Sequence, residues 1–190
     1  MSDIEQLIPR TGLQCWYEAD GITGVADGGN VATCPDKSTH ARDIVCASSY
    51  PTFETDIING LPAINWSGSQ NPLNIEDPFD AQHIIVIAAY ADAAFPVSGG
   101  AGEYAGLISG IENTGVPLLF GDPTTSKFFD LSYETYGDYE YRIRGVQYAE
   151  SVQPAPMSGN IAVIEVRFLS ALSLAGIQWG RDRKNTNRKW

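Results

Sequence analysis

The sequence has few of the residues that bind metals or form disulfide frameworks. Its 190 residues include three cysteines and two histidines. An odd number of cysteines excludes a fully paired intrachain disulfide set, and the spacing of Cys15, Cys34 and Cys46 matches no zinc signature. We interpret these thiols as small buried hydrophobic groups. A disulfide, either between Cys34 and Cys46 or between subunits, is the alternative.

Long hydrophobic runs are also missing. The first ten residues carry Asp3, Glu5 and Arg10 and no apolar stretch, so they do not resemble a secretory signal peptide. The apolar segment 84–91 is much shorter than the ~20 residues that cross a bilayer. We therefore expect cytoplasmic synthesis without a signal peptide, no membrane insertion, and release by cell lysis where the protein acts outside.

Positive charge is scarce. The chain has 12 lysines and arginines against 23 aspartates and glutamates, which gives a net charge of −11. An acidic protein repels phosphates, so nucleic acid is not the expected partner. Residues 181–190 are the exception, with five basic residues and one aspartate. We interpret them as a solvated tail or one that docks on an acidic neighbour, with contact to a polyanion as the less favoured alternative.

The sequence does contain many short apolar segments separated by turns, with 19 glycines and 11 prolines. About a dozen strand-like segments at intervals of roughly 8–12 residues predict an all-β fold, a two-sheet antiparallel β-sandwich. We divide the chain into an N-terminal arm (1–11), one β-sandwich domain (12–180) and the basic C-terminal tail (181–190).

Residues 82–91 form the segment around which the sandwich is expected to assemble. They are rich in β-branched side chains, which favour a strand. Because no charge interrupts residues 84–91, we expect this strand to be covered on both faces by sheets about 10 Å apart. Residues 160–169 predict a second long strand, with Glu165 and Arg167 facing outward. Its inward residues would be Ala162, Ile164, Val166 and Phe168.

Residues 128–133 and 139–144 alternate in polarity and predict a β-hairpin with its tip at 134–138. A sugar site needs an aromatic face and side chains that bind hydroxyl groups. The candidate glycan-binding residues at this tip are Tyr133, Tyr136, Asp138 and Tyr139. The favoured alternative is that Tyr133 and Tyr139 are cross-strand packing partners.

Calcium is the one cofactor that the sequence suggests. Asp20, Asp27 and Asn30 lie in a single glycine-rich loop and offer oxygen ligands for a hard cation. Their spacing is not that of an EF-hand, so we favour a role in capping turns.

No catalytic motif stands out. Glycoside hydrolysis needs two carboxylates about 5–9.5 Å apart, and the nearest group, Glu134, Asp138 and Glu140, is interrupted by the predicted turn. His40 and His83 lie beside no nucleophile-elbow motif. The glycine-rich residues 93–102 lack the lysine of a phosphate-binding loop. We therefore expect a non-catalytic protein.

Several short motifs together resemble the concanavalin A-like lectin/glucanase superfamily, in its laminin-G-like jelly-roll branch. The resemblance covers most of the chain and implies a two-sheet jelly roll with glycan binding or adhesion. The glucanase members carry Glu-x-Asp-x-x-Glu along one strand, which this sequence lacks. The motifs are Trp16-Tyr-Glu-Ala-Asp20, Cys34-Pro-Asp-Lys-Ser38, Pro51-Thr-Phe53, Asn59-Gly-Leu-Pro-Ala63, Trp66-Ser-Gly68 and Gly176-Ile-Gln-Trp-Gly-Arg-Asp182.

The chain departs from the family pattern in three places. Cys34 stands where the family usually has tryptophan, and Trp66 where it usually has phenylalanine. A further family strand would follow Asp182, but the chain ends at Trp190. Either that strand is dispensable or another chain supplies it, and an open sheet edge favours the second option. We therefore expect an oligomer whose partners are other protein subunits.

Small single-module chains of this kind resemble phage virion proteins. The resemblance implies a structural or decorating module of a larger assembly, in the capsid or tail of a virion. The alternative is a carbohydrate-binding adhesin at an extracellular surface that recognises a surface glycan. A glycoside hydrolase is the least favoured interpretation.

Overall fold

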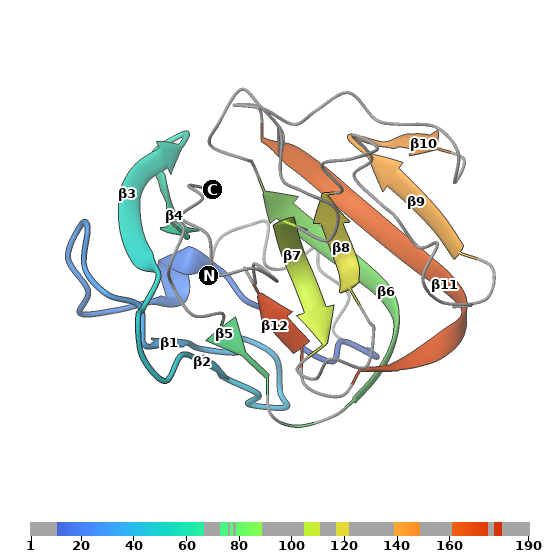
Figure 1. Cartoon of the computed structure of the whole chain (residues 1–190), viewed down its shortest axis with the longest axis horizontal. Helices are drawn as coiled ribbons and strands as arrows, with labels where there is room; N and C mark the ends of the chain where they lie inside the picture. The colour runs from blue at the N-terminus through green and yellow to red at the C-terminus, as the bar shows by residue number, and fades with distance from the viewer. Residues whose placement is uncertain are drawn as a thin grey trace.

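The computed structural model describes residues 11–66, 73–75, 77, 79–88, 105–110, 117–121, 139–148, 161–174 and 177–179. These residues form an all-β structure, with twelve strands and no α-helix (Figure 1). The one helical element among them is the 3₁₀ turn η1 (Ala19–Gly21). Consequently, this part of the chain has no helix that is long and apolar enough to cross a membrane.

The strands form three antiparallel sheets. A six-stranded sheet has the order β1-β2-β5-β12-β7-β8, a four-stranded sheet has the order β10-β9-β11-β6, and β3 pairs with β4 alone. The bounds are β1 (Thr33–Cys34), β2 (Ile44–Val45), β3 (Thr52–Ile58), β4 (Leu61–Asn65), β5 (Leu73–Asn74), β6 (Phe79–Ala88), β7 (Ala105–Gly110), β8 (Pro117–Gly121), β9 (Tyr139–Ile143), β10 (Val146–Tyr148), β11 (Ala162–Leu174) and β12 (Ile177–Trp179).

The two larger sheets contribute to one hydrophobic core. Cys34, Ile44 and Leu73 come from the six-stranded sheet, and Val86 and Ile164 come from the four-stranded sheet; all five belong to the same buried cluster. In Figure 1, β7 and β8 cross in front of β6 and β11. Removal of these apolar side chains from water is the main force that holds the sheets together.

Strand β11 has the alternation that its sequence predicts. Glu165 is partly exposed and Arg167 is exposed. The side chains expected to face inward are almost completely buried, with exposed fractions of 1% for Ala162, 0% for Ile164, 1% for Val166 and 2% for Phe168. The charged residues at alternate positions, Glu165 and Arg167, thus identified the solvent face of β11 correctly.

Strand β6 does not have the two covered faces that its sequence suggested. Val86 is 5% exposed, but Ile85 and Ile87 are 60% and 63% exposed. The reason is the antiparallel register, which pairs Ile85 with Glu165 and Ile87 with Val163. Directly paired residues lie on the same face of a sheet, so the solvent face of β11 continues across β6.

The second strand of the predicted hairpin, 139–144, is present as β9, but its hairpin partner among the described residues is β10. Both sides of β9 are already paired, with β10 on one and β11 on the other. The turn from β9 to β10 is Arg144-Gly145, with φ angles of 52° and 77°, which is the pattern of a two-residue hairpin turn. Residues 128–133 lie outside the described part of the chain.

A core substitution tests the one-sided burial of β11. We expect Ile164→Ala to lower the free energy of unfolding by about 2–5 kcal/mol, because it opens a cavity at a fully buried position. Ile161→Ala is the matched control; it removes the same atoms from a side chain that is 38% exposed, and should cost less than about 1 kcal/mol. Urea unfolding measures both, and equal losses would contradict the difference in burial between Ile164 and Ile161, the residue just before β11.

Candidate functional site

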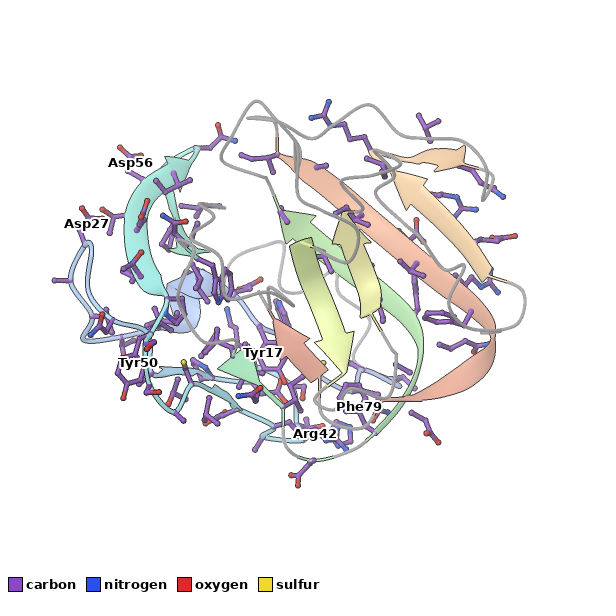
Figure 2. The ribbon with its side chains drawn as sticks, in the orientation of Figure 1. Tyr17, Asp27, Arg42, Tyr50, Asp56 and Phe79 are labelled. Carbon is purple, nitrogen blue, oxygen red and sulfur yellow. The ribbon has the colours of Figure 1, made fainter. Side chains whose placement is uncertain are left out.

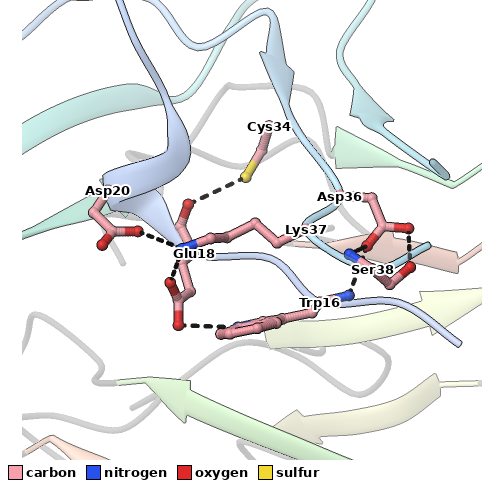
Figure 3. Close-up of polar contacts among 7 residues, drawn as sticks. All are labelled: Trp16, Glu18, Asp20, Cys34, Asp36, Lys37 and Ser38. Atoms are coloured by element: carbon pink, nitrogen blue, oxygen red, sulfur yellow. Dashed lines mark hydrogen bonds and ion pairs between the residues drawn. The ribbon is translucent and has the colours of Figure 1, made fainter. Parts of the chain in front are cut away.

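Asp36, from the second of the family-like motifs, is the centre of a hydrogen-bond cluster (Figure 3). Its Oδ1 accepts from the backbone N–H groups of Trp16 and Ser38, both at 2.8 Å. Its Oδ2 accepts from Ser38 Oγ at 2.6 Å and from the backbone N–H of Arg42 at 2.9 Å. Partial burial pushes the pKa of Asp36 upward, but the hydrogen bonds from Ser38, Arg42 and Trp16 outweigh it and leave that pKa below its ordinary value.

Arg42 links the loop of Asp36 to the four-stranded sheet. Its guanidinium carbon lies 5.1 Å from the centroid of the Phe79 ring at the start of β6 (Figure 2). Its Nη1 donates to the carbonyl oxygen of Gln14 at 2.8 Å, and its own carbonyl oxygen accepts from Tyr17 Oη at 2.5 Å. The motif residues therefore fasten the N-terminal segment to the body of the fold.

Lys37 is held by residues of the first motif. Its Nζ pairs with the carboxylate of Glu18 and lies 3.5 Å from Oδ1 of Asp20. It also lies 5.1 Å from the centroid of the Trp16 ring, and Trp16 Nε1 donates to Glu18 Oε1 at 2.9 Å. Residues 13–18 form none of the named strands and are held by these side chains; their one β-bridge joins Tyr17 to Asp36.

The three calcium candidates have different partners. Asp20 lies beside Lys37, while Asp27 Oδ1 accepts from the N–H and Oγ1 of Thr55 at 2.8 and 2.9 Å. These two hydrogen bonds lower the pKa of Asp27. Asn30 forms a β-bridge with Thr52. Within the described residues no group of three or more histidines, cysteines or acidic residues could hold a metal, so calcium binding stays a prediction.

The cysteines are free thiols. Cys34 and Cys46 are 1% and 6% exposed, which confirms their interpretation as buried residues, whereas Cys15 is half-buried. Burial, followed by the charge of nearby carboxylates, raises the pKa of Cys15 to about 11 and that of Cys34 to about 12. Burial also raises the pKa values of Cys46 and Tyr17. A thiol with such a pKa carries almost no thiolate at neutral pH and is a poor nucleophile.

The glycan candidates are not brought together in the described part of the chain. Tyr133, Tyr136 and Asp138 lie outside it, as does Glu134. Tyr139 begins β9, where its backbone is paired with that of Phe168 in β11. Their role in sugar binding therefore stays a prediction.

The best candidate surface is the solvent face of the four-stranded sheet, which we call the outer face. Sequence patterns did not reveal it, although Glu165 and Arg167 marked it in β11. An ion network crosses its centre: Glu165 lies 2.8 Å from Nε2 of His83 and 3.5 Å from Nη1 of Arg142, which is 3.7 Å from Glu140 through Nη2. The outer face consists of His83, Ile85, Ile87, Glu140, Arg142, Val163, Glu165 and Arg167.

One side of the outer face is apolar and lies along an edge. Ile85, Ile87 and Val163 are 60%, 63% and 45% exposed, and the register places Val163 beside Ile87. Among the strands that the structure describes, β6 is the last in the order of this sheet. Exposed apolar side chains at a strand edge are typical of a surface that contacts another protein.

Comparison with family models, with curated proteins and with solved structures finds no match to this chain. Its function must therefore be inferred from its own residues and their geometry.

Asp36→Asn tests the role of the hydrogen-bond cluster. We expect it to lower the free energy of unfolding at pH 7 by about 2 kcal/mol, since an amide cannot accept all four bonds. Asp80→Asn, which changes an exposed aspartate of β6, should have little effect. Because the pKa of Asp36 is lowered in the folded state, its contribution is present above pH 3.8 and is lost as the pH falls through the lower folded value. The difference between wild type and Asp36→Asn should therefore shrink in acid, and a difference independent of pH would contradict this role.

Thiol reactivity tests the burial of the cysteines. At pH 8 we expect all three to react with iodoacetamide much more slowly in the native protein than in urea, because burial holds them protonated. Their raised pKa values also imply that their contribution to stability is complete below pH 9.0 and falls as the pH rises toward about 11 and 12. A thiol that reacts at the unfolded rate in the folded protein would contradict this assignment.

Proposed function

We propose that this chain is a non-catalytic module that serves as a structural or decorating component of a larger protein assembly. One observation carries the proposal: the exposed apolar residues Ile85 and Ile87 lie on β6, the last of the described strands of its sheet, and the exposed Val163 of β11 lies beside Ile87. An exposed apolar patch beside a polar region is the usual composition of a protein–protein contact. The partners are therefore other protein subunits.

The fold that we propose for this module is a jelly-roll sandwich of the concanavalin A-like type. Two findings support it. All described strand pairs of the two larger sheets are antiparallel, and buried residues of both sheets belong to one core. The motif residues Trp16, Asp36 and Ser38, which carry the family resemblance, are also joined by hydrogen bonds.

The polar groups of the N-terminal half favour a structural role over a catalytic one. The carboxylates of Glu18, Asp27 and Asp36 are each bound to side chains or backbone groups of the same domain. The thiols of Cys15 and Cys34 have raised pKa values. Groups engaged in this way hold the fold together and are not poised for proton transfer or nucleophilic attack.

The setting that we propose is a phage virion, which rests on the resemblance of the sequence to small single-module virion proteins. Sequencing of the genes that flank this one tests the setting. We expect capsid or tail genes, and genes of a metabolic pathway would contradict it.

A binding and hydrolysis screen tests the proposed function itself. We expect no saturable binding on a glycan array and no cleavage of a polysaccharide panel, because the described polar groups serve the fold. Glycan binding that is lost in Tyr136→Ala but kept in Tyr50→Ala would replace the proposal with a carbohydrate-binding adhesin. Hydrolysis that is lost in Glu134→Gln or Glu140→Gln would replace it with a glycoside hydrolase.

A further inference from the structure

We infer that the edge of β6 pairs antiparallel with β6 of a second copy of this chain, so that two four-stranded sheets join into one. The inference rests on the proposed function, since it names the partner of the contact surface. The occupant is an identical chain, related by a two-fold axis perpendicular to the sheet. Two-fold dimers are the commonest protein oligomers, and each contact in them occurs twice.

Residues 83–88 of β6 lack the lysine, proline or bulge that keeps many sheet edges apart. Natural edge strands are short, or carry lysine, proline or a bulge. β6 has ten residues, none of which is lysine or proline. Its pairing with β11 runs without a register shift from Ala88 to His83. Residues 84–88 are uncharged, so this segment offers a regular, apolar edge to a partner strand.

One register makes this strand complementary to itself. If the two-fold axis passes at Val86, Ile85 of each copy lies opposite Ile87 of the other on the outer face. The inner face then pairs Val86 with Val86 and Ile84 with Ala88. Val163 beside each Ile87 extends the apolar strip on both sides. An axis one residue earlier would instead place His83 opposite Ile87, so the centre at Val86 gives the better match.

The charge distribution favours a second copy over other partners. The chain as a whole carries −11, but the outer face carries Glu140 and Glu165 against Arg142 and Arg167. Within its own copy, Glu165 forms an ion pair with Arg142 and lies within hydrogen-bond distance of His83. Two acidic chains can therefore meet at this face without the repulsion that they would experience elsewhere. An anionic membrane or nucleic acid finds no basic excess here.

Sedimentation equilibrium of matched variants tests the interface. We expect wild type to dimerise and Ile87→Lys to raise the dissociation constant about tenfold, because a charged side chain replaces the apolar cross-strand contact with Ile85 on both sides of the axis. Val146→Lys is the control: this valine of β10 is 55% exposed at the opposite edge of the same sheet, and its variant should dimerise like wild type. Circular dichroism establishes that each variant is folded.

Two results of that experiment would overturn the inference. One is a wild type that stays monomeric at the highest soluble concentration. The other is equal weakening of the dimer by Ile87→Lys and Val146→Lys, which would show a general effect of charge.

Disulfide trapping tests the register. Residues directly opposite in an antiparallel pair lie within the Cα separation that a disulfide requires, whereas diagonal neighbours are farther apart. We expect a mixture of Ile85→Cys and Ile87→Cys to give a linked heterodimer, identified by mass spectrometry. Each variant alone should give much less disulfide-linked dimer. Equal linkage in the mixture and in the single variants, or no linkage at all, would contradict the register centred on Val86.

The inference and the proposed function fail in different ways. A wild type that is monomeric in isolation but occupies fixed positions in a particle of other proteins would overturn β6 pairing and leave the proposed function intact. Glycan binding or hydrolysis of the kind defined above would overturn the proposed function, whatever the oligomeric state.

Discussion

The antiparallel pairing of β6 with β11 is the constraint on which the rest of the structure depends. It joins the two long strands from Ala88 and Ala162 to His83 and Arg167, and paired residues must share a face. Burial of Ile164 and Val166 in the core therefore brings Val86 inward and turns Ile85 and Ile87 outward. The core and the apolar edge are two consequences of the same register.

The N-terminal segment shows how family-like motifs can serve the fold. Asp36 gathers four hydrogen bonds from Trp16, Ser38 and Arg42, and Arg42 continues the connection to Phe79 at the start of β6. Each of these contacts replaces hydration of a polar group whose burial would otherwise be costly. The motif thus fixes an irregular segment against the sheet, and the outer face lies on another part of the molecule.

Local patterns predicted the features that depend on local physics. Glu165 and Arg167 identified the outer face of β11. The Asn59-Gly60 dipeptide lies at the turn between β3 and β4 and has the positive φ angles, 52° and 82°, that this dipeptide favours. The exposed face of β6 could not be predicted in this way. Its uncharged sequence fits burial on both sides, and only the pairing with Glu165, about eighty residues later, decides which isoleucines meet water.

Pairing between distant segments also explains why the sequence predicted the wrong hairpin partner for β9 and did not reveal the outer face. Arg144-Gly145 directs β9 to β10, and alternation in 128–133 gave no sign that both sides of β9 would be occupied. The outer face combines residues from three strands, so no single segment revealed it.

Hydrogen exchange at different protein concentrations tests the central claim most directly, because it reports on the edge of β6 itself. The account predicts that the amides of residues 84–88 that point away from β11 become protected as the concentration rises, while the amides of β10 at the opposite edge do not change. Protection in β6 that is independent of concentration would contradict the account.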